Sequence, residues 1–171
     1  VLNSLSGTVY SMGGAIYTEN EDIKIQNCTF SGNLAVGSNS LGAACYVALP
    51  HIEHSTFANN ATASPSYTVY IHGVSTGDTA KIINTVIWDN AGSTNFGSPG
   101  AGFVLRNSIV QGGYSSGIKV INSNPFFEDA NGSDNVPGNI DDDLRLRSGS
   151  PAIDSGWTHM APTKDITGYL R

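Results

Sequence analysis

Charged residues are scarce in this 171-residue chain, in which Lys, Arg, Asp and Glu make up 13% of the residues. Soluble domains usually carry about 25%. The eight basic residues are scattered and are outnumbered by fourteen acidic ones, so the formal net charge is −6. Nucleic-acid-binding proteins need dense Lys/Arg patches, and we therefore expect no nucleic-acid partner. The sequence also lacks any run of 18 apolar residues, which argues against membrane insertion.

Cysteines are nearly absent, with only Cys28 and Cys45, and no Cys or His pair completes a zinc-site spacing. Two cysteines cannot define a disulfide framework, and the repeat described below places them in different strands. We predict two free thiols that pack as small apolar side chains. Helical periodicity is absent too, which leaves short strands separated by Gly, Asn and Ser.

One nine-residue pattern occurs four times in the sequence. It is found at residues 25–33 (IQNCTFSGN), 52–60 (IEHSTFANN), 82–90 (IINTVIWDN) and, more weakly, 105–113 (LRNSIVQGG). The copies follow one another at intervals of 27, 30 and 23 residues. Strands without helices at such a repeat predict an all-β fold, a right-handed single-stranded parallel β-helix, over residues 1–121.

Coils of such a solenoid place equivalent side chains above one another, about 4.8 Å apart. The sixth residues of the copies should form an internal apolar column: Phe30, Phe57, Ile87 and Val110. The third residues should lie at a corner, where Asn tolerates left-handed backbone. There we expect an internal amide ladder of Asn27, Asn84 and Asn107, with His54 as a hydrogen-bonded corner residue. The alternative is an antiparallel sandwich, which gives no reason for an Asn before an apolar residue in each period.

Residues 122–171 lack the repeat, and we predict that they form a C-terminal cap. The open end of a solenoid exposes unpaired backbone and needs cover. Pro125, Pro137 and Pro151 cannot donate to a strand ladder, so they suit a segment that ends a sheet. At the other end, the chain is expected to continue into further coils of a longer protein.

Two parts of the sequence resemble known families. Gly13-Gly14-Ala15-Ile16, followed by Phe30-Ser31-Gly32-Asn33, resembles the paired GGA-I and F-x-x-N repeats of chlamydial polymorphic membrane protein passenger domains. Residues 124–129 (NPFFED) and 143–156 (DLRLRSGSPAIDSG) resemble the end of β-helix domains in bacterial surface proteins of the choice-of-anchor type. The resemblance implies a bacterial, secreted or cell-surface right-handed parallel β-helix, but no single activity, because this fold hosts enzymes, adhesins and scaffolds.

A tyrosine ends the short strand that precedes three of the repeats: Tyr17, Tyr46 and Tyr70. Strand alternation should point all three outward on one face. An exposed aromatic column of this kind is a candidate ligand-binding site, because the rings can stack on sugars. The alternative is a self-stacking ladder that only stiffens the sheet.

Acidic residues concentrate in the tail, and Asp129, Asn131 and Asp134 place oxygen ligands at nearby positions around a glycine. This spacing makes calcium a candidate cofactor, although the distal glutamate of an EF-hand is missing. The alternative is an Asx-rich solvated turn. His51 and His54 lie three residues apart on a strand and so face opposite sides, which excludes a shared metal ion.

The favoured function is a non-catalytic adhesin or glycan-interacting scaffold, secreted or displayed on a cell surface. Its partner would be a polysaccharide or a host or cell-surface glycan. The alternatives are a carbohydrate-active enzyme of the pectate-lyase-like class, either a polysaccharide lyase or a glycoside hydrolase, and a purely structural spacer. No catalytic residues can be assigned. Residues 34–41 and 91–101 are expected to be loops that project from the coils and carry function.

Overall fold

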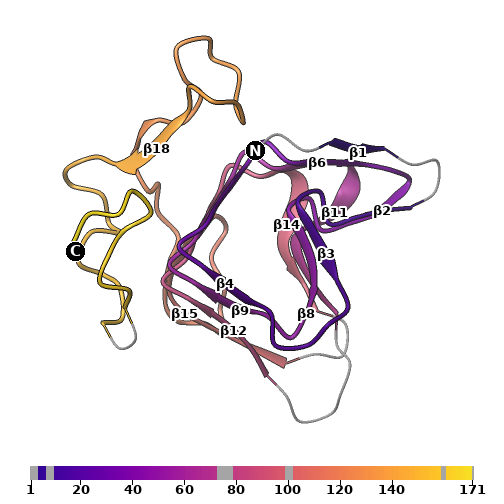
Figure 1. Cartoon of the computed structure of the whole chain (residues 1–171), viewed down its shortest axis with the longest axis horizontal. Coiled ribbons are helices and arrows are strands. Elements are labelled where there is room, and N and C mark those ends of the chain that lie inside the picture. The colour runs from indigo at the N-terminus through magenta and orange to yellow at the C-terminus, as the bar shows by residue number, and fades with distance from the viewer. Residues whose placement is uncertain (1–3, 7–9, 73–78, 99–101, 159–160, 171) are drawn as a thin grey trace.

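The computed structural model describes residues 4–6, 10–72, 79–98, 102–158 and 161–170. All regular structure in these residues is β-strand, and parallel strands stack into a solenoid of about three turns. Figure 1 looks along the stack, so that strands of successive coils overlap. The predicted all-β parallel solenoid is therefore confirmed, while its handedness stays a prediction.

Two large sheets form the walls of the coils. The first contains β1 (Ser4–Ser6), β3 (Ile16–Thr18), β6 (Leu34–Val36), β8 (Cys45–Ala48), β11 (Ala61–His72) and β14 (Ala91–Gly97). The second contains β4 (Lys24–Gln26), β5 (Thr29–Ser31), β9 (His51–Glu53), β10 (Thr56–Ala58), β12 (Thr79–Ile83), β13 (Val86–Trp88), β15 (Gly102–Val110) and β16 (Ile118–Ile121). A separate parallel pair joins β2 (Tyr10–Met12) to β7 (Asn39–Leu41). Residues 34–41 and 91–101 were expected to be projecting loops. Instead, β6 and β7 lie in the first segment and β14 in the second, while residues 99–101 lie outside the described part.

The predicted apolar column runs through the interior. Phe57 is in register with Phe30 on one side and with Ile87 on the other, and Ile87 is in register with Val110. The Phe30 and Phe57 rings stack with centroids 4.6 Å apart and planes 5° from parallel. A second buried column, from the first residue of each copy, lies beside it: Ile25, Ile52, Ile82 and Leu105. Burying each such side chain stabilises the fold by about 1.5–3 kcal/mol.

The internal amide ladder is real, but the prediction of its members was wrong. The ladder consists of Asn33, Asn60 and Asn90, the last residue of each copy. The Oδ1 atom of Asn60 accepts hydrogen bonds from the backbone N and the Nδ2 of Asn33, and Asn90 Oδ1 accepts the same pair from Asn60. Because the motif carries an amide at both its third and its last position, spacing alone did not separate the inner row from the outer one.

The third-position residues do lie at corners of the coils, as expected. Asn27, His54, Asn84 and Asn107 have φ angles of 55°, 50°, 52° and 49°. The three asparagine side chains bond to the C-terminal tail instead of forming an internal ladder, and the His54 ring is hydrogen-bonded to Asn84, as predicted for a corner residue. We call these four residues the corner row.

Both cysteines are free, as predicted. Cys45 belongs to the buried core, and Cys28 packs against that core at intermediate exposure. Burial strongly raises the pKa of the Cys45 thiol. A thiol with a raised pKa is a poor nucleophile, so Cys45 serves packing.

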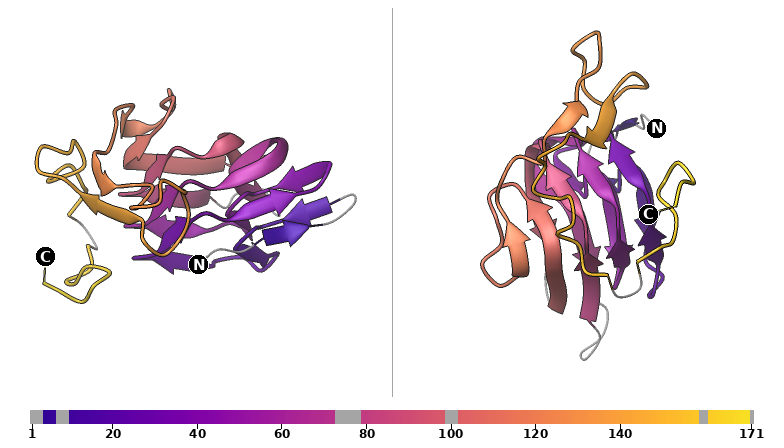
Figure 2. Two further views of the ribbon diagram at one scale, coloured as in Figure 1. Left: turned by 90° about the horizontal axis from the view of Figure 1, so that it is seen from above. Right: turned by 90° about the vertical axis from the view of Figure 1, so that its left-hand side faces the viewer.

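The tail, residues 122–170 as described, lies along the outside of the coils. Its two strands, β17 (Phe127–Asp129) and β18 (Asp143–Leu146), form an antiparallel pair, and neither pairs with a described coil strand. Figure 2 shows the yellow end of the tail running across the strands of successive coils. The described tail thus lies beside the coils, and its role as a cap on the open end of the solenoid stays a prediction. In the described part of the chain, no helix is long and apolar enough to cross a membrane.

Candidate functional site

The three predicted tyrosines lie side by side in the first sheet. Tyr17 of β3 is in register with Tyr46 of β8, which is in register with Tyr70 of β11. The Tyr17 and Tyr46 ring centroids are 5.1 Å apart, and so are those of Tyr46 and Tyr70, with interplanar angles of 23° and 14°. The parallel register therefore produces a continuous stack of rings, which we call the tyrosine column.

The column is less exposed than predicted. Tyr17 is 52% exposed, but Tyr46 is only 6% exposed, because its two ring faces are covered by its neighbours. Tyr67 packs at a tilt against Tyr70, with centroids 5.6 Å apart. The Tyr67 ring occupies the space above Gly97, where a Cβ would lie 2.5 Å from it. The expectation of three exposed rings is thus wrong for Tyr46, and Tyr17 provides the exposed ring of the column.

Polar groups line the hydroxyl side of the column. The Tyr17 hydroxyl donates to Glu19 Oε1 at 2.6 Å, and the Tyr46 hydroxyl is hydrogen-bonded to His72 Nδ1 at 3.1 Å. The His72 ring also stacks on Tyr46, with centroids 5.7 Å apart. The hydrogen bond to Glu19 raises the pKa of Tyr17, and burial raises the pKa of Tyr46. The phenols therefore remain neutral hydrogen-bonding groups at pH 7.

Sequence reasoning missed Glu19 and His72 as neighbours of the column. Each follows a column tyrosine by two positions, Glu19 after Tyr17 and His72 after Tyr70. Residues two apart on a strand lie on the same face, which applies to His72 at the end of β11, and Glu19 directly follows β3, so the alternation that predicted the tyrosines could also have identified these two. An exposed aromatic ring beside polar groups is the combination that suits a sugar, which has apolar ring faces and hydroxyl edges.

The predicted calcium ligands lie in the tail. Both carboxylate oxygens of Asp134 accept hydrogen bonds, one from Val136 N at 2.8 Å and one from Asn139 Nδ2 at 2.9 Å. The loop is organised around Asp141, whose Oδ2 accepts from Ser133. In the described residues, no group of three or more His, Cys, Asp or Glu side chains is arranged to hold a metal ion. Asp129 is exposed at the end of β17, Asn131 is exposed in the turn that follows, and calcium binding there stays a prediction.

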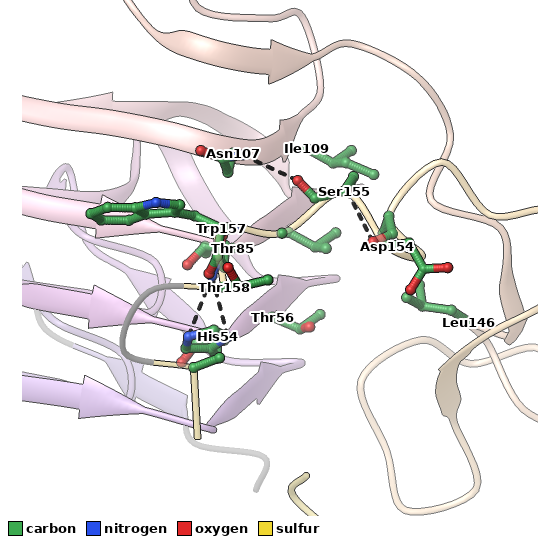
Figure 3. A pocket seen from close by; sticks show the side chains of 16 residues that line it. His54, Thr56, Thr85, Asn107, Ile109, Leu146, Asp154, Ser155, Trp157 and Thr158 are labelled. Atoms are coloured by element: carbon green, nitrogen blue, oxygen red, sulfur yellow. Dashed lines mark hydrogen bonds between the residues drawn. The ribbon is translucent and has the colours of Figure 1, made fainter. Parts of the chain in front are cut away.

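A second feature is the contact between the corner row and the end of the tail, residues 151–170, which we call the strap. Figure 3 shows the strap residues Ser155, Trp157 and Thr158 lying against coil residues that include His54 and Asn107. Coil and strap residues together line a groove of about 660 Å³. Its lining is mixed in polarity, and it is bridged by hydrogen bonds from the corner side chains to the strap backbone.

Comparison with known proteins gave no match to a family model, to a curated protein or to a solved structure. The geometry of the two features above is therefore the basis for any functional assignment.

Proposed function

We propose that this chain is a non-catalytic, glycan-interacting scaffold of a secreted or cell-surface protein, acting as an adhesin. The observation that carries the proposal is the tyrosine column, in which the exposed Tyr17 ring is backed by two further stacked rings. A ring held in this way loses little conformational freedom on binding, which favours stacking against a sugar.

The polar side of the column supports the same ligand class. Glu19 accepts the hydroxyl hydrogen of Tyr17 and has further acceptor capacity for sugar hydroxyls. The overall shortage of charge favours neutral glycans over highly charged ones. Secretion or surface display by a bacterium is part of the proposal because of the sequence resemblance. We also propose that the coils wind in a right-handed sense, because crossover connections between parallel strands are right-handed in about 98% of cases.

A carbohydrate-active enzyme is the second candidate, and one observation favours it. The Tyr46 hydroxyl and the His72 imidazole form a hydrogen-bonded pair on the same face as Tyr17. Such a pair can take and give a proton during elimination or hydrolysis of a polysaccharide. Against this, Tyr46 is 6% exposed, so a substrate atom would have to reach its hydroxyl beside the stacked rings.

The test compares binding to a glycan array by the unmodified chain and by Tyr17→Ala. We expect the variant to lose binding about tenfold, equal to about 1.4 kcal/mol, because the exposed stacking surface is gone. Tyr17→Phe keeps the ring and should retain binding within about threefold. The matched control is Tyr169→Ala, which removes a ring that is 75% exposed but lies in the tail.

Unsaturated product from acidic polysaccharides, followed by ultraviolet absorbance, distinguishes the enzyme from the adhesin. Product formation that is lost in His72→Ala would replace the adhesin proposal with the lyase. Equal array binding by Tyr17→Ala and the unmodified chain would remove the column as the site. A chain that neither binds nor forms product would be a structural spacer.

A further inference from the structure

The strap is held mainly through its backbone. Asn107 Nδ2 donates to Ser155 O at 3.1 Å, and Asn27 Nδ2 donates to Lys164 O at 2.9 Å. Between them, Asn84 makes a reciprocal pair with Trp157, donating from Nδ2 to its carbonyl at 2.8 Å and accepting from its N–H at 2.6 Å. An amide side chain that pairs with both polar groups of one residue imitates the edge of a β-strand.

The spacing of the corner row explains why one extended segment can reach several corners. Each residue of the row has left-handed backbone, and successive corners stack from coil to coil. Asn84 N donates to Arg106 O in the next coil, for example, at 3.2 Å. The row thus presents three amides, with the His54 ring between the first two, and their bonds to strap carbonyls suit the backbone of any sequence.

One strap side chain adds specificity. The guanidinium carbon of Arg106 lies 3.9 Å from the centre of the Trp157 ring, a cation–π contact. The other large apolar side chains that the structure describes in the strap are exposed, which means that they add little to its docking: Ile153 46%, Ile166 60%, Tyr169 75% and Leu170 80%. A segment with so little buried apolar surface opens locally at low free-energy cost.

We propose that the corner row and Arg106 form a docking site for an extended polypeptide with a tryptophan, and that the strap of a second copy is its partner. Within one chain the strap occupies this site in cis. A second copy carries an identical strap and an identical row, so exchange forms the same contacts twice and requires no new surface. The cis strap competes at an effective concentration in the mM range, which keeps the unmodified chain monomeric when dilute.

The test mixes two full-length variants that complement each other. Trp157→Ala keeps the row intact but weakens the strap, whereas a chain with Asn84→Ala and Arg106→Ala keeps the strap but weakens the row. Light scattering should give the mass of a monomer for each variant alone. An equimolar mixture of the two variants should give the mass of a dimer. A third chain, carrying all three changes, should form no dimer with Trp157→Ala, because no intact strap is present.

A mixture that stays monomeric overturns the proposal, as does a dimer with the triply changed chain. Hydrogen exchange at residues 151–158 of Trp157→Ala must rise at least tenfold over the unmodified chain, and unchanged protection would also refute the role of Trp157. If circular dichroism shows that the chain with Asn84→Ala and Arg106→Ala has lost its β-strand signal and does not fold, the mixing experiment uses Arg106→Ala alone as the variant with the weakened row. Arg106 is half-buried on the outside of the coil, where the core does not depend on it.

Discussion

The coils and the tail are held together by different interactions. In the coils, like side chains stack in register, and large apolar residues such as Phe57, Ile52 and Ile82 are fully buried. In the tail, the described strands form one short antiparallel pair, and carboxylates accept hydrogen bonds from nearby turns. Its ion pairs, Arg145–Asp143 and Arg147–Glu128, are exposed. Exposed ion pairs contribute about 0–1 kcal/mol each.

We infer that the coils draw their stability from repeated apolar contacts, whereas hydrogen bonds within turns fix the conformation of the tail. When one coil stacks on another, every inward side chain packs against its equivalent in the neighbouring coil, so a single register buries the whole column. The tail has no such neighbour and depends on local hydrogen bonds and on the corner row. The two regions should therefore respond to different perturbations, and the following experiments separate them.

The largest effect is expected from Phe57→Ala. Phe57 is fully buried between Phe30 and Ile87, so truncation leaves a cavity in the apolar column. We expect the free energy of unfolding to fall by about 3–5 kcal/mol, measured by denaturant titration. The control is Phe126→Ala in the tail, where the side chain is 46% exposed and the loss should be under about 1 kcal/mol. Equal losses would show that the column does not dominate stability.

An intermediate effect is expected from Asn60→Ala. This side chain links Asn33 to Asn90, and its Nδ2 also donates to Phe30 O at 3.0 Å. Its loss leaves buried partners unsatisfied, at about 1–3 kcal/mol for each group. Asn59→Ala is the adjacent control, since Asn59 Nδ2 donates outward to Ala130 O of the tail, and we expect about 1 kcal/mol. Thermal unfolding of the two variants should rank Asn60→Ala as clearly the less stable.

The smallest effect is a local response of the tail to acid. Hydrogen bonds from the Ser133 hydroxyl and nearby backbone lower the pKa of Asp141, and the Thr167 hydroxyl does the same for Asp165. A carboxyl whose pKa is lower when folded adds stability above its ordinary pKa, about 3.9, and loses it as pH falls below that value. Amide NMR signals of residues 132–141 and 165–170 should therefore shift between about pH 4 and pH 2, before those of the coils.

Asp141→Asn provides the control for the acid response. It should abolish the shift around residues 132–141 while preserving the one around Asp165, because the two carboxyls lie in separate turns. Coil signals that move first on acidification would contradict the division between the two regions.

The register of the coils was predictable, because the repeated motif aligns Phe30 with Phe57, and the short strand that precedes each motif aligns Tyr17 with Tyr46. The burial of Tyr46 was not, since it depends on how closely neighbouring rings approach. The exchange of roles between Asn27 and Asn33 also escaped sequence reasoning, because both positions of the motif carry an amide and the repeat does not show which one points inward. The docking of the strap left no pattern in the sequence, because most of its described bonds involve backbone atoms.

The amide ladder gives the solenoid a chemical direction. Asn33 and Asn60 each donate from the backbone N and Nδ2 to the Oδ1 of the asparagine in the next coil. Asn33 Oδ1 is buried and has no hydrogen-bond partner among the described residues, while Asn90 Nδ2 is bonded to Phe57 O and Trp88 O. The two ends are therefore not interchangeable. Lengthening the array by design would require a donor at the Asn33 end and an acceptor beyond Asn90.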